Sequence, residues 1–256
     1  MLKLPKFDYF FLLLLIISCS KKPEKNKAEV TKQNIQVTDS IAKSPVYNFY
    51  KNFVLGKFDY KKDSLFVKVD AKHSSKTLFL QKETYEAFKK MHYKAKQDGI
   101  NLIIISGTRN YYEQKYIWER KWKKYSDLKP IERAKKILEY SSMPSSSRHH
   151  WGTDIDLNNL NNSYFKKGKG KKEYEWLHNN ANDFGFYQVY TNKKNGRKGY
   201  NEEKWHWTYL PLSKKYLTFF NAKINNEDIN GFNGATLASE LNIINDYVNG
   251  VSVKIK

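Results

Sequence analysis

The sequence has few cysteines, few glycines and prolines, and a shortage of acidic side chains. With 12 Gly and 6 Pro in 256 residues it is neither collagen-like nor of low complexity, and a 16% aromatic content excludes a wholly disordered chain. Asp and Glu number 26 against 46 Lys and Arg, which gives a formal net charge of +20. This excess predicts an anionic partner: nucleic acid, a membrane surface or a carboxylate-bearing polymer.

The sequence also lacks an apolar run of about twenty residues, the length that a membrane-spanning helix needs. Its longest run, Phe10 to Ile17, has the length of a signal-peptide core and follows a short basic start. The run ends in Ile16-Ile17-Ser18-Cys19, which resembles the lipobox of bacterial lipoproteins. We therefore expect residues 1–18 to be a signal peptide and Cys19 to carry lipid. The protein would then be a membrane-anchored lipoprotein of the cell envelope, facing the periplasm or the cell exterior.

Lipid on Cys19, the only cysteine, would leave the mature chain without a free thiol. A disulfide and a thiolate metal site are then excluded, so any metal must be bound by histidine and carboxylate side chains. Nucleic acid is not expected as a partner of an exported, tethered chain. Cell-wall carboxylates and anionic lipid head groups match the positive charge better.

Composition and periodicity predict a linker, one main domain and a helical extension. Residues 19–45 are polar and lysine-rich, as in a solvated linker, residues 46–225 form the domain, and residues 226–256 pack on it. Helices and short strands mix without a regular βαβ repeat, which indicates the α+β class. The expected helices are Glu83–Asp98, Tyr111–Lys123, Ile131–Tyr140, Lys171–Asp183, Leu212–Phe220 and Ala235–Val248, and the expected strands are Asn101–Ser106, Thr153–Leu157 and Glu203–Leu210.

Three segments carry side chains suited to hydrolytic chemistry: SRHHWGTDID at 147–156, EKWH at 203–206 and SGTRNYYEQ at 106–114. A catalytic zinc site needs three protein ligands and an open fourth position, and His149, Asp156 and His206 could supply them. A carboxylate three residues before a ligand histidine, as Glu203 is, can act as a general base. Arg109, after a buried strand, is placed to stabilise an oxyanion or hold a carboxylate.

These segments resemble, in the same order, the patterns S-x-H-x-x-G-x-A-x-D, E-x-W-H and S-G-Y-R-S-x-x-x-Q of the zinc D-Ala-D-Ala carboxypeptidases and dipeptidases. That family shares a superfamily with lysostaphin-type and hedgehog amino-terminal domains. The similarity spans roughly Phe53 to Phe220 and implies a small central antiparallel sheet with flanking helices. It implies that zinc is bound by His149, Asp156 and His206 and that Glu203 is the base. Arg109 is implied to contact the substrate near the scissile carbonyl. The resemblance further implies that Ser147 orients the metal loop or the substrate, and that Gln114 is structural or faces the substrate.

The chain departs from the family pattern at Asp154, where alanine is usual, and at Thr108 and Ser145. On a strand, residues 154 and 156 face the same side, so alternation alone leaves the choice of ligand open. The resemblance selects Asp156, seven residues after His149. Asp154 would then alter pKa values near the metal or favour cationic groups in the pocket.

The other histidines have ordinary structural interpretations. His73, His92 and His178 lack partners at ligand spacing. His150 adjoins a candidate ligand, but on an extended segment it would point to the opposite face and pack or donate a hydrogen bond there.

The expected function is a zinc-dependent D-alanyl-D-alanine carboxypeptidase that trims peptidoglycan stem peptides. Two alternatives share this chemistry: a D,D-dipeptidase and an endopeptidase that cuts cross-links. A third alternative is a catalytically silent wall-binding lipoprotein, against which stand the retained Glu203 and the complete ligand set.

Overall fold

The computed structural model describes residues 45–255, apart from the side chains of residues 45–49 and 195. The expected signal peptide, Cys19 and the linker up to residue 44 lie outside the described residues. Within the described range, no helix has both the length and the apolar character needed to cross a membrane.

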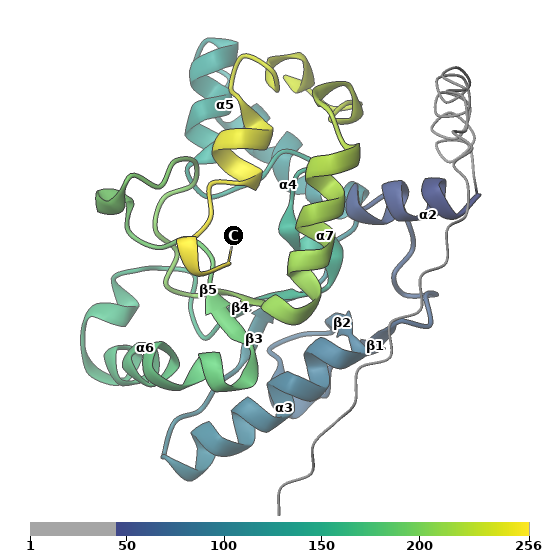
Figure 1. Ribbon diagram of the computed structural model, residues 1–256. Coiled ribbons are helices and arrows are strands. Elements are labelled where there is room, and N and C mark those ends of the chain that lie inside the picture. The colour runs from purple at the N-terminus through teal and green to yellow at the C-terminus, as the bar shows by residue number, and fades with distance from the viewer. Residues whose placement is uncertain (1–44, 256) are drawn as a thin grey trace, which may run out of the picture. The chain divides into compact units, whose positions relative to one another are not determined.

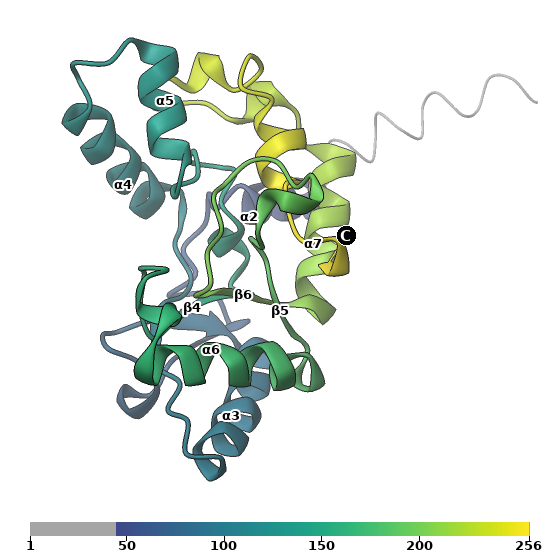
Figure 2. The same cartoon turned by 90° about the vertical axis from the view of Figure 1, so that its left-hand side faces the viewer.

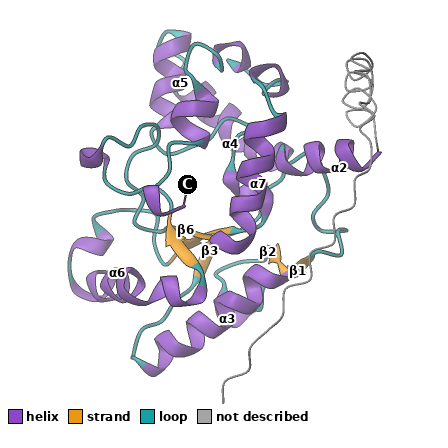
Figure 3. Ribbon diagram, in the orientation of Figure 1, coloured by secondary structure: helices purple, strands orange, loops and turns teal. Residues whose placement is uncertain are grey.

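Helices and short strands are interspersed along the chain without a regular repeat (Figure 1; Figure 3). Strands β3, β4, β6 and β5 form an antiparallel sheet in that order, and β1 and β2 form a separate antiparallel pair. This arrangement confirms the α+β class with a small antiparallel sheet. The α-helices are α2 (Pro45–Val54), α3 (Lys82–Gln97), α4 (Tyr111–Lys124), α5 (Pro130–Leu138), α6 (Gly168–Asn180) and α7 (Leu210–Lys223). The strands are β1 (Phe66–Lys68), β2 (Phe79–Gln81), β3 (Ile104–Ser106), β4 (Asp154–Leu157), β5 (Phe186–Gln188) and β6 (His206–Tyr209).

Local sequence explains where several helices begin and end. Helix α4 begins with a capping box, in which Asn110 accepts from the backbone of Glu113 and the Glu113 side chain accepts from the backbone of Asn110. Helix α5 has Pro130 in its first turn. Helix α3 ends before Gly99, which adopts a φ of +74°. The expected helices in this part of the chain are therefore confirmed to within a few residues.

The central sheet has one apolar and one polar face. Ile155 and Leu157 of β4 and Trp207 of β6 are buried in a core with helices α3 and α6. Because side chains alternate along a strand, Asp154 and Asp156 lie on the other face. Both views place the sheet between α3 and α6 on one side and α4, α5 and α7 on the other (Figure 1; Figure 2). The polar face is thus the one on which a site can form.

The prediction of a continuous helix over Ala235–Val248 is wrong. The chain forms a 3-10 turn at Ala235–Leu237 and a π-helical turn at Ile243–Val248. Between them Asn242 adopts a left-handed conformation with a φ of +50°. A left-handed residue interrupts the hydrogen-bond run of a right-handed helix, so the segment is divided into two short turns.

Residues 226–255 complete a second core. Ile243, Val251 and Ile255 are buried with Trp118 of α4 and Ile137 of α5. The backbone of this segment also extends the sheet edge: Ser252 N donates to Val189 O at 2.8 Å, and Val189 N donates to His206 O at 3.1 Å. The segment therefore supports the strand that carries His206.

Replacing a buried side chain of this segment should destabilise the whole domain. Ile243 is 0% exposed, so Ile243→Ala should lower the free energy of unfolding by about 2–5 kcal/mol. Val253, 72% exposed, offers a control whose truncation should cost no more than about 0.5 kcal/mol. Urea unfolding of the two variants checks this, and equal midpoints would contradict it.

Candidate metal centre

Strand register brings the central residues of the site into one row. Ser106 of β3 lies opposite Asp156 of β4, and Asp156 lies opposite His206 of β6. Asp154 lies opposite Thr208 in the same pair of strands. Directly opposed residues in an antiparallel pair have Cβ atoms about 4.5–5.5 Å apart, so Asp156 and His206 are neighbours by backbone geometry alone.

A tight turn before β4 places His149 above this row. Residues Arg148–Trp151 form a 3-10 turn that ends at Gly152, with a φ of +69°. A Cβ on Gly152 would collide with the ring of Phe66, so glycine is required here for both conformation and space. His149 Nδ1 lies 2.8 Å from Gly107 O. A carbonyl only accepts, so Nδ1 carries the hydrogen and Nε2 is left to bind a metal.

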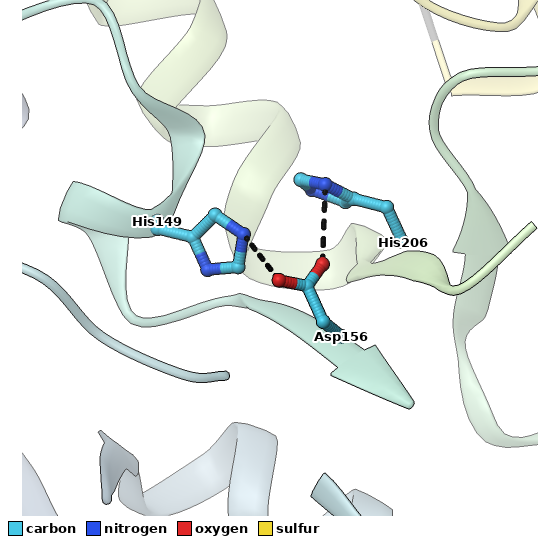
Figure 4. Close-up of side chains that lie close together, drawn as sticks. All are labelled: His149, Asp156 and His206. Carbon is cyan, nitrogen blue, oxygen red and sulfur yellow. Dashed lines mark ion pairs between the residues drawn. The ribbon is translucent and has the colours of Figure 1, made fainter. Parts of the chain in front are cut away.

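Asp156 points toward both imidazoles (Figure 4). Its Oδ2 lies 3.4 Å from His149 Nε2, and its Oδ1 lies 3.5 Å from His206 Nδ1. One ligand atom from each of the three residues lies within 4.8 Å of the others, and all three residues are buried. The structure therefore brings together the three residues that the sequence nominated as ligands.

The geometry of this cluster fits zinc. Two nitrogens and one oxygen form a known donor set for catalytic zinc, and tetrahedral ligands bound at about 2.0–2.2 Å lie roughly 3.3–3.5 Å from one another. The spacings of Asp156 to the two imidazoles match that figure. Asp156 Oδ1 is buried and accepts no hydrogen bond from the described residues, as expected of an oxygen reserved for a cation.

Burial and neighbouring charges set the protonation of the cluster. Burial alone would raise the pKa of Asp156, but the imidazoles and Arg109 outweigh it and lower the pKa to about 2. For His206, burial opposes the charge, yet hydrogen bonds to Asp154 and Glu203 raise its pKa to about 10. In both groups the neighbouring charges and hydrogen bonds outweigh burial and favour the ionised form.

Glu203 adjoins the candidate metal position. Its Oε2 lies 3.1 Å from His206 Nδ1, the nitrogen that also faces Asp156. Gln188 Nε2 donates to the Glu203 backbone carbonyl at 3.1 Å, which fixes the loop. Burial raises the pKa of the Glu203 carboxyl, as is useful in a group that takes up and releases a proton.

Arg109 is fixed by two side chains. Its Nε donates to Gln114 Oε1 at 3.0 Å and its Nη1 donates to Ser106 Oγ, while Gln114 Nε2 donates to Ser142 O at 2.8 Å. Gln114 therefore orients Arg109. Ser147 is buried, and its Oγ makes no hydrogen bond to the described residues.

The other histidines lie outside the cluster. His73 Nδ1 pairs with Tyr85 OH at 2.7 Å, and His92 Nδ1 donates to Leu102 O at 3.0 Å. His178 packs near the ring of Tyr174 on α6. His150 is fully buried and its Nδ1 donates to Arg109 O at 2.7 Å. His150 lies in the 3-10 turn, so the expectation that it lies on an extended segment is wrong. The expectation that it packs and donates a hydrogen bond agrees with the structure.

The sequence singled out Asp154 but did not predict its direct contact with His206. Asp154, fully buried, accepts from Arg148 Nε and lies 2.9 Å from His206 Nε2, with Thr208 beside it. The signal was present: Thr208 follows His206 by two residues on one strand, and therefore shares its face. Tyr190 was also missed, and its ring meets the His206 ring edge-on at 4.8 Å.

A cleft of about 850 Å³ opens over the cluster. Asp156, His149, His206, Glu203 and Arg109 all line it, whereas Asp154 is not among its lining residues in the described chain. Asp154 lies behind His206, so it does not face cationic groups of a substrate there. The other expectation for Asp154, an effect on pKa values near the metal position, agrees with the raised pKa of His206. Further cations line the cleft, namely Lys76, Arg120 and Lys121.

A buried histidine and carboxylate cluster beneath a cleft, with a carboxylate beside it, defines a metallohydrolase type of site. The sequence model of the VanY D-alanyl-D-alanine carboxypeptidase family matches residues 77–212, more than half of the chain. The protein belongs to this family, which confirms the resemblance seen in its motifs.

Two curated relatives are similar to the chain. The putative carboxypeptidase YodJ of Bacillus subtilis (strain 168) is 30% identical over 138 residues, which are 52% of this chain and 46% of that protein. A D-alanyl-D-alanine carboxypeptidase of Enterococcus faecalis (strain ATCC 700802 / V583) is 29% identical over 121 residues, 46% of this chain and 43% of that protein. The matched region thus spans less than half the length of either relative.

Solved structures similar to the chain include VanYB and LdcB. VanYB in complex with D-alanine-D-alanine is 20% identical, with a TM-score of 0.49, and the match covers 75% of this chain and 92% of that chain. The LD-carboxypeptidase LdcB is 24% identical, with a TM-score of 0.49, and the match covers 66% of this chain and 77% of that chain.

The purified protein should bind one zinc ion per chain through the three clustered side chains. Asp156→Ala removes the carboxylate between the two imidazoles, so zinc affinity should fall by more than the roughly 10- to 100-fold typical for loss of an outer hydrogen-bond partner. His92→Ala, away from the cluster, serves as control and should retain wild-type affinity. Competition with a chromophoric chelator measures both, and equal affinities would contradict the assignment.

Proposed function

We propose that the protein is a zinc-dependent D-alanyl-D-alanine carboxypeptidase that removes terminal D-alanine from peptidoglycan stem peptides. The observation that carries the proposal is the joint placement of the ligand cluster, Glu203 and Arg109 along one cleft. Family membership supports the reaction class. The cations that line the cleft suit a substrate that ends in a carboxylate.

In the proposed reaction His149, Asp156 and His206 hold zinc. Zinc supplies Lewis-acid chemistry, which makes a water molecule more acidic and polarises the scissile carbonyl. The Glu203 carboxylate, 3.1 Å from His206 Nδ1, is placed to take the proton of the attacking water and return it to the leaving amine. Its raised pKa matches that double task.

Arg109 would stabilise the negative charge that develops on the carbonyl oxygen. Ser106 and Gln114 hold its guanidinium, so little reorganisation is needed when the charge appears. The side chain lines the cleft together with Glu203 and Asp156. Burial lowers the pKa of the Arg109 guanidinium, and the charges of Asp156 and Glu203 partly offset that effect. Ser147, buried beside His149 in the chain, is proposed to orient the metal loop or the substrate.

Replacing the proposed base should slow the hydrolytic reaction without affecting zinc binding. Glu203→Gln should slow release of D-alanine by about 10²- to 10⁴-fold while leaving zinc content unchanged. Glu202→Gln, the neighbouring carboxylate, is the matched control and should keep wild-type turnover. Mass spectrometry of pentapeptide-stem muropeptides measures the loss of one D-alanine.

The same experiment separates the alternatives. Cleavage of free D-Ala-D-Ala alone would identify a dipeptidase, and conversion of cross-linked dimers to monomers would identify an endopeptidase. Intact substrates in every assay, with zinc bound, would instead support a wall-binding protein without activity.

We also propose that lipid on Cys19 anchors the enzyme in the cell envelope, near its substrate. The lipobox-like sequence that ends at Cys19 and the basic composition support this location. Cys19→Ala should move the protein from the membrane fraction to the soluble fraction of the producing cells, whereas Ser20→Ala should not. Retention of the Cys19→Ala variant in the membrane fraction would contradict the anchor.

A further inference from the structure

The most densely bonded carboxylate in the site belongs to a residue that does not reach the cleft. Asp154 is 0% exposed, and each of its oxygens has two partners. Oδ2 accepts from Arg148 Nε at 2.9 Å and lies 2.9 Å from His206 Nε2. Oδ1 accepts from Thr153 Oγ1 at 3.0 Å and from Thr208 Oγ1. A carboxylate bonded in this way cannot rotate freely.

The contact with His206 commits one ring nitrogen to a hydrogen bond and leaves the other for a metal. An ionised carboxylate only accepts, so His206 Nε2 must donate to Asp154 Oδ2. Nδ1 lies 3.1 Å from Glu203 Oε2 and 3.5 Å from Asp156 Oδ1, so it faces the candidate metal position, and a metal bound there would replace any hydrogen on Nδ1. In a neutral imidazole with a hydrogen on Nε2, Nδ1 has the lone pair that a metal requires.

The two histidines therefore present different ring nitrogens to the metal position. His149 donates from Nδ1 to the Gly107 carbonyl and presents Nε2. His206 donates from Nε2 to a carboxylate and presents Nδ1. A carboxylate is the stronger acceptor of the two and increases the basicity of the ring.

Arg148 holds the Asp154 carboxylate in place. Its Nε pairs with Asp154, its Nη2 donates to Thr208 Oγ1 at 3.0 Å, and its guanidinium lies over the Trp151 ring at 4.7 Å. Thr208 lies directly opposite Asp154 in the strand pair. Arg148 and Thr208 thus hold the carboxylate from two sides.

We propose that Asp154 is a positioning residue that orients His206 through its Nε2–H, so that Nδ1 faces the metal, with Arg148 and Thr208 fixing the carboxylate. This inference rests on the zinc site of the proposed function. It gives a role to the aspartate that occupies the position of the alanine in the family pattern matched by the sequence.

Zinc affinity tests the proposal without reference to activity. Asp154→Ala should weaken zinc binding about 10- to 100-fold, and Asp154→Asn, which keeps an acceptor oxygen, should lose less. Glu173→Gln is the matched control, because Glu173 is a buried carboxylate on α6 that hydrogen-bonds to Tyr164. It should retain wild-type affinity. In the cobalt-substituted protein, the visible spectrum should change in Asp154→Ala and stay unchanged in Glu173→Gln.

Asp156→Ala distinguishes failure of the inference from failure of the site. If Asp156→Ala loses zinc while Asp154→Ala keeps wild-type affinity and spectrum, the positioning role is overturned and the metal site stands. If neither variant loses affinity, the metal site and the inference are both wrong.

Ring nitrogen NMR of the zinc-loaded wild-type protein gives a readout that needs no variant to fold. His206 should show a hydrogen on Nε2 and a metal-bound Nδ1. A hydrogen on Nδ1 would overturn the proposal.

Discussion

The pairing register of β4 and β6 is the constraint on which the rest of the site depends. It sets Asp156 against His206 and Asp154 against Thr208, and β3 adds Ser106 on the other side of Asp156. A slip by one residue would turn every one of these side chains to the opposite face. The apolar residues that alternate with them, Ile155 and Trp207 among them, prevent the slip, because their burial against α3 and α6 specifies the same register.

Several charged side chains are buried together at this site, and the rest of the domain must offset the free energy that their burial costs. Removing ions from water costs free energy that mutual attraction only partly offsets, so such clusters add little to stability by themselves. Here Arg148 pairs with Asp154, and Arg109 lies near Asp156 and Glu203. The apolar cores on both sides of the sheet supply the stability that lets the charged cluster persist.

Much of the helical framework and the ligand set could be predicted from the sequence, because these depend on local signals. The apolar face of α3, the capping box of α4 and the spacing of His149 and Asp156 each depend on residues that lie close together in the sequence. The contact of Asp154 with His206 was not predicted, because alternation gives the face on which each residue lies but not the strand register that brings the two residues together. The turns of residues 235–248 were missed because apolar spacing does not reveal a left-handed residue such as Asn242.

The hydrogen bonds from Ser252 through Val189 to His206 have a consequence for the order of assembly. Every candidate ligand and the base leave the ribosome before residue 252 does. Arg197, in the loop before Glu203, donates to the carbonyl of Gly250, a residue that is also made later. Until residues 250–252 are made, the Val189 carbonyl and the Arg197 guanidinium lack these two hydrogen-bond partners, although the four strands of the sheet and every candidate ligand have already been synthesised.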